Sequence, residues 1–171
     1  MKIGAFVGKF YPPHIGHLSA IDYACTKLDI VYVIISKNQE RENQIRKLSS
    51  FEIIPAELIK SWFEDYYKNN SKVKVEIFDE QGLLPYPSDQ DKWAKRFKAQ
   101  FPFINVKIAD ESYKDFNKKY FPEYDFLAID RNKIDIHSSY FRKNPQKYIN
   151  FLIPKAQNYF LDVIKKEKNN G

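Results

Sequence analysis

Cysteine, histidine and glycine are scarce in this chain of 171 residues, and their scarcity excludes several classes of protein. The single cysteine, Cys25, cannot form an internal disulfide, which favours the cytoplasm as the location. With three histidines in all, a zinc site would have few ligands to draw on. No apolar run reaches the length of a membrane span, and the first residues lack the apolar block of a signal peptide. The sequence therefore predicts a cytoplasmic protein without a membrane partner.

Repeats, low-complexity segments and Gly/Ser-rich linkers are also missing, so nothing in the sequence marks a domain boundary. We therefore expect one domain over 1–171, long enough to bury a core without disulfides or metal. The net charge is +6, but the basic residues are scattered, and the one cluster, Lys165–Lys168, resembles a solvated helix end. This pattern favours small phosphate-bearing partners over nucleic acid.

Segments with strand and helix patterns alternate along the chain. Strands are expected at 2–7, 29–36, 72–78, 105–109 and 124–130, and helices at 17–27, from 55, at 89–101 and 112–120, from 138, and at 154–166. The apolar helix faces comprise Leu18, Ile21, Cys25 and Leu28 in the first helix, and Leu58, Ile59, Trp62, Phe63 and Tyr66 in the second. This order predicts an α/β fold with a Rossmann-like parallel sheet of about five strands and helices on both faces. Ligands bind such sheets at the carboxyl ends of the strands.

The run Gly8–His17 lies at the first of these strand ends and contains two histidines, His14 and His17. Their spacing puts both imidazoles on one side of the first helical turn, where backbone N–H groups favour anions. Gly16 has no side chain to block a ligand, and Lys9 adds a flexible positive charge. The run therefore predicts a site for nucleotide phosphates.

Two other interpretations of the histidine pair stay open: an incidental structural pair, and a zinc site completed by His137 or a carboxylate. A kinase-type phosphate loop does not fit. Only three residues separate Gly4 from Gly8, and no Ser or Thr follows the lysine to hold magnesium.

A second anion-binding pattern occurs late in the chain, after the strand that ends at Asp130. Ser138 is expected to cap a helix, which would place Ser139 and Arg142 together in its first turn. A hydroxyl, free N–H groups and a guanidinium would then meet at one spot and suit a polyphosphate. The alternative is a capped surface helix with a solvated arginine.

These two motifs resemble the His-x-Gly-His turn and the Ser/Thr-x-x-Arg helix start of the nucleotidylyltransferase superfamily. Within it, Gly8–His17 is similar to nicotinamide mononucleotide (NMN) adenylyltransferases of the NadR type. So are Phe78–Pro87 followed by Asp91–Trp93, and Arg142–Pro145 with Ile153–Pro154. The resemblance covers most of the chain and implies the nucleotidylyltransferase fold.

The resemblance also implies a reaction, in which the NMN phosphate attacks the α-phosphorus of ATP in line and yields NAD and pyrophosphate. Its implied catalytic residues are His14, His17, Lys9 and Arg142. Its implied ATP-binding residues are Gly8, Lys9, Phe10, His14, Gly16, His17, Asp130, Lys133, Ser139 and Arg142. Trp93 would stack on the nicotinamide, with Tyr86 in the same pocket. Mg²⁺ would come with ATP and be held mainly by its phosphates, so no protein ligand to metal is expected.

Three departures from the family pattern concern the expected adenine and phosphate contacts, and other functions stay open beside the implied one. Glu57 and Lys133 stand where the family tends to have arginine, and His137 replaces a small or hydroxyl residue. The alternatives are adenylyl or cytidylyl transfer to another phosphate acceptor, such as phosphopantetheine or glycerol phosphate, and a non-catalytic nucleotide-sensing module. CTP is disfavoured because residues 131–137 lack the glycine of the cytidylyltransferase motif. The sequence leaves a homo-oligomer open.

Overall fold

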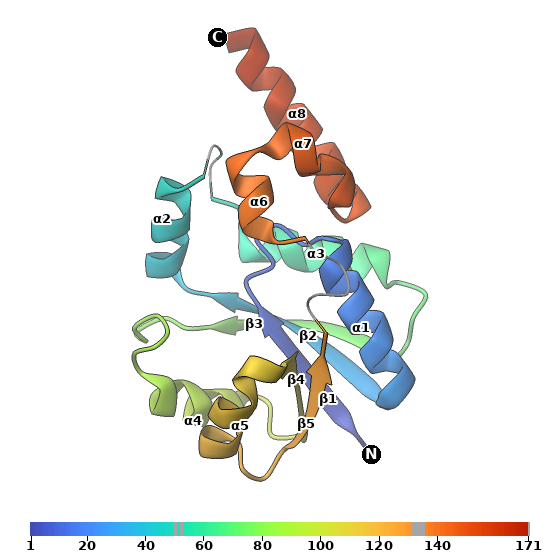
Figure 1. The fold of residues 1–171 in the computed structure, drawn as a ribbon, viewed down its shortest axis with the longest axis vertical. Coiled ribbons are helices and arrows are strands. Elements are labelled where there is room, and N and C mark those ends of the chain that lie inside the picture. The colour runs from blue at the N-terminus through green and yellow to red at the C-terminus, as the bar shows by residue number, and fades with distance from the viewer. Residues whose placement is uncertain (50, 52, 131–135, 171) are drawn as a thin grey trace.

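A single parallel sheet forms the centre of the molecule, as a computed structural model describes it for residues 1–49, 51, 53–130 and 136–170 (Figure 1). Its strands are β1 (Ile3–Gly8), β2 (Ile30–Lys37), β3 (Val73–Asp79), β4 (Val106–Asp110) and β5 (Asp125–Ile129). They pair in parallel in the order β3-β2-β1-β4-β5. The expected α/β fold is confirmed, with every strand end within one residue of its predicted position.

Helices follow the strands in the order that the sequence predicts, with two additions. They are α1 (Ile15–Lys27), α2 (Gln39–Lys47), α3 (Ala56–Tyr66), α4 (Gln90–Gln100), α5 (Lys114–Tyr120), α6 (Ser138–Lys143), α7 (Pro145–Tyr148) and α8 (Pro154–Asn170). Single 3₁₀ turns are η1 (Glu111–Tyr113) and η2 (Ile149–Phe151). The sequence predicted neither α2 nor α7, because α2 buries only Glu42 and Ile45 and α7 buries no residue. The first helix begins two residues earlier than predicted, at Ile15 instead of His17.

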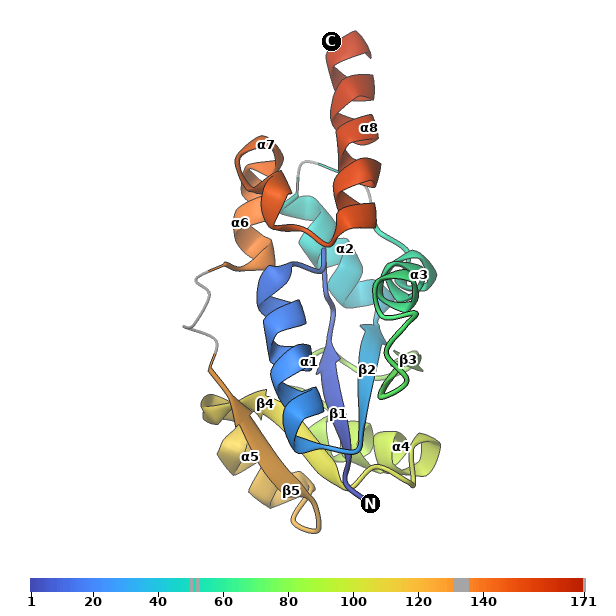
Figure 2. The ribbon, with the colours of Figure 1, turned by 90° about the vertical axis from the view of Figure 1, so that its right-hand side faces the viewer.

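Helices cover both faces of the sheet and form two apolar cores (Figures 1 and 2). On one face α1 and α3 pack on the sheet through residues such as Ile21 and Phe63. On the other face α4 and α5 enclose a cluster rich in phenylalanine. Two details of the predicted faces are wrong: the Tyr66 side chain is 44% exposed, and Cys25 is only half-buried because Ala24 occupies the inward position.

The C-terminal helices α6, α7 and α8 lie beyond the carboxyl edge of the sheet, and α8 extends away from it (Figure 2). This region is tied to the turn before α1. The backbone of His14 forms an antiparallel bridge with Leu152, and the Ile153 N–H donates to the Pro13 carbonyl at 3.2 Å. No helix among the described residues is long and apolar enough to cross a bilayer.

The strand order places a crevice at the end of β1. Strand β1 pairs with β2 on one side and with β4 on the other, so the chain connections leave β1 in opposite directions. Such a switch in strand order opens a space beyond the carboxyl ends of the strands, where ligands of open α/β sheets bind. Both predicted anion-binding motifs come to this edge.

Candidate functional site

The two histidines cap the N-terminus of α1 reciprocally. The Gly16 N–H donates to Nδ1 of His14, and the His14 N–H donates to Nδ1 of His17, each at 3.1 Å. Both Nδ1 atoms act as acceptors, so the proton of each neutral imidazole resides on Nε2. The rings stack with centroids 3.7 Å apart. The turn thereby fixes the tautomer and orientation of both rings.

Gly16 is required by this capping arrangement. A Cβ at this position would lie 2.9 Å from Cε1 and 3.0 Å from Nδ1 of His14. Gly16 was expected to leave room for a ligand, but the first atoms that a side chain would meet belong to the His14 ring. The glycine therefore positions the histidine.

Phe10 packs against His17. Its backbone has a positive φ of 52°, an unusual conformation for a residue with a bulky side chain. Its ring meets that of His17 edge-on, with centroids 4.8 Å apart, and also packs on Phe63 in the core. The end of β1 thus holds the second imidazole against a buried aromatic surface.

Lys9 is held in place, contrary to the expected flexible charge. Its ammonium group donates to the Ser36 carbonyl at 2.9 Å and lies 3.5 Å from Oε1 of Glu42. Burial lowers the pKa of Lys9, and the carboxylates of Glu42 and Glu80 oppose that shift. The cation is fixed at the end of β1, beside the first motif.

The late motif reaches the same place by hydrogen bonds to the backbone of the first. A guanidinium N–H of Arg142 donates to the Tyr11 carbonyl at 2.9 Å, and the Ser138 hydroxyl donates to the Pro12 carbonyl at 2.9 Å. The expected N-cap role of Ser138 is wrong, because His137 is the N-cap and the Ser138 hydroxyl is used in this contact. Burial, followed by the charge of Arg41, lowers the pKa of Arg142.

One cavity collects most of the predicted ATP-binding residues, and we call it the histidine cavity. Its volume is about 760 Å³. The predicted residues that line it are Gly8, Lys9, Phe10, His14, Gly16, His17, Asp130, Ser139 and Arg142. Lys133 falls outside the described residues. Arg41 of α2 also lines it and was missed, since the short, charged helix α2 gives little apolar signal.

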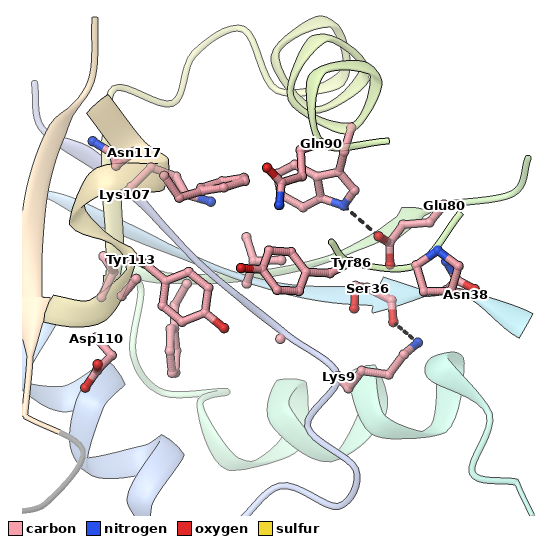
Figure 3. A pocket seen from close by; sticks show the side chains of 18 of the residues that line it. Lys9, Ser36, Asn38, Glu80, Tyr86, Gln90, Lys107, Asp110, Tyr113 and Asn117 are labelled. Carbon is pink, nitrogen blue, oxygen red and sulfur yellow. Dashed lines mark hydrogen bonds between the residues drawn. The ribbon is translucent and has the colours of Figure 1, made fainter. Parts of the chain in front are cut away.

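A second cavity, the tryptophan cavity, contains Trp93 and Tyr86 and has a volume of about 420 Å³ (Figure 3). The indole N–H of Trp93 donates to Oε2 of Glu80 at 2.6 Å, and its ring stacks on Phe97 with centroids 5.2 Å apart. Burial raises the pKa of the Glu80 carboxyl, while the indole hydrogen bond opposes the shift. Trp93 therefore belongs to the aromatic core and to the cavity wall. Tyr86 is 71% exposed at the rim.

The two cavities adjoin at the end of β1. Residues that line both are Phe6, Val7, Gly8, Lys9, Arg41, Tyr113 and Ile129. Two ligands held in these cavities would therefore meet beside Lys9 and Arg41. This arrangement suits a transfer between two substrates, one of them rich in phosphate.

Lys107 and Asn117 also line the tryptophan cavity, and the sequence analysis did not select either. A signal for Lys107 existed, because it is a single charge inside the apolar run of β4. Asn117 had no such signal, since α5 is polar on most of its surface.

Glu57, one of the departures from the family pattern, does not line either cavity. Its carboxylate pairs with the ammonium group of Lys37 at 2.8 Å, and both side chains are largely exposed. The hydrogen bond from Lys37 lowers the pKa of Glu57. Among the described residues, no three His, Cys, Asp or Glu side chains form a group that could hold a metal.

The sheet order, the capped helix N-terminus and the adjoining cavities are those of an open α/β fold with its candidate ligand site at the carboxyl edge of the sheet. A comparison with protein families makes the class specific. The chain belongs to the cytidylyltransferase-like family, whose model matches residues 5–144.

Relatives of known structure or curated description agree with this family. The trifunctional NAD biosynthesis/regulator protein NadR of Salmonella typhimurium is 26% identical over 95% of this chain and 42% of its own length. The chain thus spans less than half the length of this curated relative. A crystal structure of NadR with NAD and AMP-PNP superposes with a TM-score of 0.69 at 25% identity, over 89% of this chain and 44% of NadR.

A bifunctional NMN adenylyltransferase/ADP-ribose pyrophosphatase from Francisella tularensis, crystallised with AMP and a manganese ion, is also similar. Its TM-score is 0.55 at 25% identity, over 91% of this chain and 43% of that one. The chain is therefore a nucleotidyltransferase-family protein related to NMN adenylyltransferases.

Proposed function

We propose that this protein transfers the adenylyl group of ATP to NMN, which produces NAD and pyrophosphate. The observation that carries the proposal is the junction of the two cavities at the end of β1, beside Lys9. One cavity offers the histidine pair and several cations, and the other offers a tryptophan ring. The ligands named in the related structures, NAD and AMP-PNP in one and AMP in another, support this assignment.

ATP would lie in the histidine cavity with its α-phosphate at the N-terminus of α1. The Nε2 protons of His14 and His17 would donate to oxygens of the α-phosphate, whose negative charge grows in the transition state. Lys9, Ser139 and Arg142 would hold the β- and γ-phosphates. Arg41 lines the same cavity and adds a further cation for the departing pyrophosphate.

The chemistry is a single in-line displacement. An oxygen of the acceptor's 5′-phosphate forms a bond to the α-phosphorus, while the bond from that phosphorus to the bridging oxygen breaks and pyrophosphate leaves. No nucleophile on the protein is needed, because the site contributes position and charge. Mg²⁺ enters with ATP as part of that substrate and is held mainly by its phosphates.

NMN would lie in the tryptophan cavity with its phosphate toward the histidine cavity. Its nicotinamide ring carries a positive charge, which an aromatic face stabilises. Trp93 would supply that face, and Tyr86 at the rim would cover the pocket. The Glu80 carboxylate, through the indole N–H, keeps the tryptophan ring in its orientation.

Glu57 gives no support to the alternative of a nucleotide-sensing module, since it pairs with Lys37 away from the lining of both cavities. The decisive experiment is incubation of the pure protein with Mg²⁺, ATP or CTP, and a panel of acceptors. We expect NAD from ATP and NMN, with nicotinate mononucleotide a poorer acceptor. Turnover of phosphopantetheine or glycerol phosphate without turnover of NMN would overturn the proposal. Binding of nucleotide without any turnover would favour the sensor.

A further inference from the structure

Lys107 is a buried cation to which the proposed reaction assigns no task. The residue is only 7% exposed, and among the described residues no carboxylate forms an ion pair with it. Side chains alternate along β4, which turns Lys107 toward the aromatic cluster beneath α4 and α5. Its ammonium nitrogen lies 4.9–5.2 Å from the ring centroids of Trp93, Phe97 and Phe121. Aromatic rings therefore face this charge where an acid would be expected.

Lys107 also lines the tryptophan cavity, and its side chain extends from β4 toward that cavity (Figure 3). Trp93 lines the same cavity and is the ring that the proposed function assigns to the acceptor. The indole already contacts the Lys107 cation, while its N–H donates to Glu80. A ligand that stacks on Trp93 would therefore share this ring with Lys107.

Charged groups on the elements packed around Lys107 are exposed or engaged elsewhere. On α4 the ammonium group of Lys98 pairs with Glu123 at 2.7 Å, and β1 has no charged residue. Two acids line the cavity with Lys107: Glu80 accepts the indole N–H, and Asp110 accepts a backbone N–H of η1 at 3.0 Å. The other charged residues of α4, α5 and β5 are exposed: Asp91, Lys92, Lys95, Arg96, Lys114, Asp115, Lys118, Lys119 and Asp125. The other titratable residues of the lining are Lys9, Arg41, Tyr86 and Tyr113.

We propose that Lys107 determines specificity by charge: its ammonium group repels a cationic ring in the tryptophan cavity, so that NMN binds when the amine is neutral. This inference rests on the proposed function and adds a charge requirement to acceptor binding. A pyridinium ring stacked on Trp93 would bring a second positive charge to the aromatic cluster, where burial strengthens the repulsion between like charges. An uncharged ring of the same shape would meet no such repulsion.

Burial also makes the charge of Lys107 easy to remove, because it lowers the pKa of Lys107 to about 7. At about pH 6 only about a tenth of the molecules would then have a neutral amine, and at about pH 8.5 nearly all would. If the neutral form alone binds a cationic ring, KM for NMN should be up to about tenfold higher at the lower pH, since the competent form is only partly populated there.

The test compares NMN with the 5′-phosphate of benzamide riboside, which has the same ribose phosphate and carboxamide on an uncharged ring. Pyrophosphate release reports turnover of either acceptor, and KM is measured at about pH 6 and at about pH 8.5. Both acceptors have a phosphate that ionises in this range, so its effect cancels in the ratio of the two KM values. We expect the ratio of KM for NMN to KM for the analogue to fall roughly three- to tenfold from the lower to the higher pH.

Two variants assign the effect to Lys107. Lys107→Met should abolish the change with pH and keep the ratio at its high-pH value. Lys98→Met is the matched control, since Lys98 also contacts the Phe121 ring but lies outside the cavity lining, and it should retain the full pH dependence. A pH dependence that persists in Lys107→Met contradicts the inference.

The outcomes separate this inference from the proposed function. If the unmodified protein makes no NAD from NMN at either pH, both fail. If it makes NAD and the ratio of the two KM values is the same at both pH values, only the charge requirement fails.

An NMR titration of the Lys107 side chain in the unmodified protein covers the case of misfolded variants. Because ligand binding and protonation are linked, bound NMN should move the titration of Lys107 to lower pH, and the uncharged analogue should move it less. An equal response to both compounds, or to neither, contradicts the inference.

Discussion

Replacing His17 by alanine separates the structural and chemical uses of the histidine turn. In the structure His17 accepts the His14 N–H, stacks on the His14 ring and packs on Phe10. Loss of the capping hydrogen bond alone costs about 0.5–2 kcal/mol of stability. For a chain of this length, each kcal/mol lowers Tm by about 2–4 °C. The folded state should therefore survive, with a melting temperature lower by several degrees.

The effect on turnover should be far larger. If His17 donates to the α-phosphate as its charge grows, its removal should lower kcat by about 10²–10³-fold, or about 2.7–4 kcal/mol. A second variant, His17→Gln, offers a carbonyl oxygen at the third helical position, where glutamine is a normal capping partner. It should regain much of the lost stability and little of the lost turnover.

The assay is a coupled measurement of NAD formation together with thermal melting of both variants. Near-normal kcat in His17→Ala would refute the reasoning, because it would remove His17 from the chemistry. Parallel recovery of stability and kcat in His17→Gln would also refute it, since the imidazole would then act only as a cap.

Three further variants probe neighbouring parts of the account. Gly16→Ala should lower kcat by roughly 10–100-fold with little change in Tm, because the new methyl group displaces the His14 ring; unchanged kcat would contradict this. Trp93→Ala should lower stability, because the indole packs on Phe97, and should also raise KM for NMN several-fold to about thirtyfold with ATP binding unchanged; an unaltered KM for NMN, or an equal effect on both substrates, would leave Trp93 a structural role only. Lys107→Met should stabilise the fold by a few kcal/mol at pH 6 and by much less at pH 10. Burial of the charged Lys107 destabilises the folded state. Because the folded-state pKa of about 7 lies below the unfolded value of 10.5, this destabilisation is complete below pH 7 and disappears as pH rises toward 10.5. Urea unfolding at pH 6 and at pH 10 measures the difference in stability.

The strands could be predicted because buried parallel strands are continuous apolar runs, and polar or turn-forming residues separate one run from the next. Helix α2 was not predicted because its residues are mostly charged and only Ile45 gives an apolar contact. Its position therefore depends on tertiary contacts such as that between Glu42 and Lys9. Arg41 belongs to this helix, so its place in the lining of both cavities was not predicted either.

The histidine turn was recognisable from its spacing, but its internal hydrogen bonds were not. Spacing predicts that two rings share a side of a helix, whereas the reciprocal use of their Nδ1 atoms depends on the backbone conformation before α1. In the same way, the sequence pattern made Ser138 a candidate for the helix cap, but in the folded chain its hydroxyl donates to the Pro12 carbonyl, which is distant in sequence. The strand order, which makes β1 and β4 neighbours and so brings Lys107 beside Trp93, has no local signature.

The most direct test of adenylyl transfer follows the α-phosphate of ATP. The protein is incubated with NMN, Mg²⁺ and ATP labelled at that phosphorus, and the products are separated. The account predicts that the label enters NAD, with one pyrophosphate released for each NAD formed and none of the label attached to the protein. Label found in ADP, in AMP alone or on the protein itself would contradict direct transfer between the two cavities.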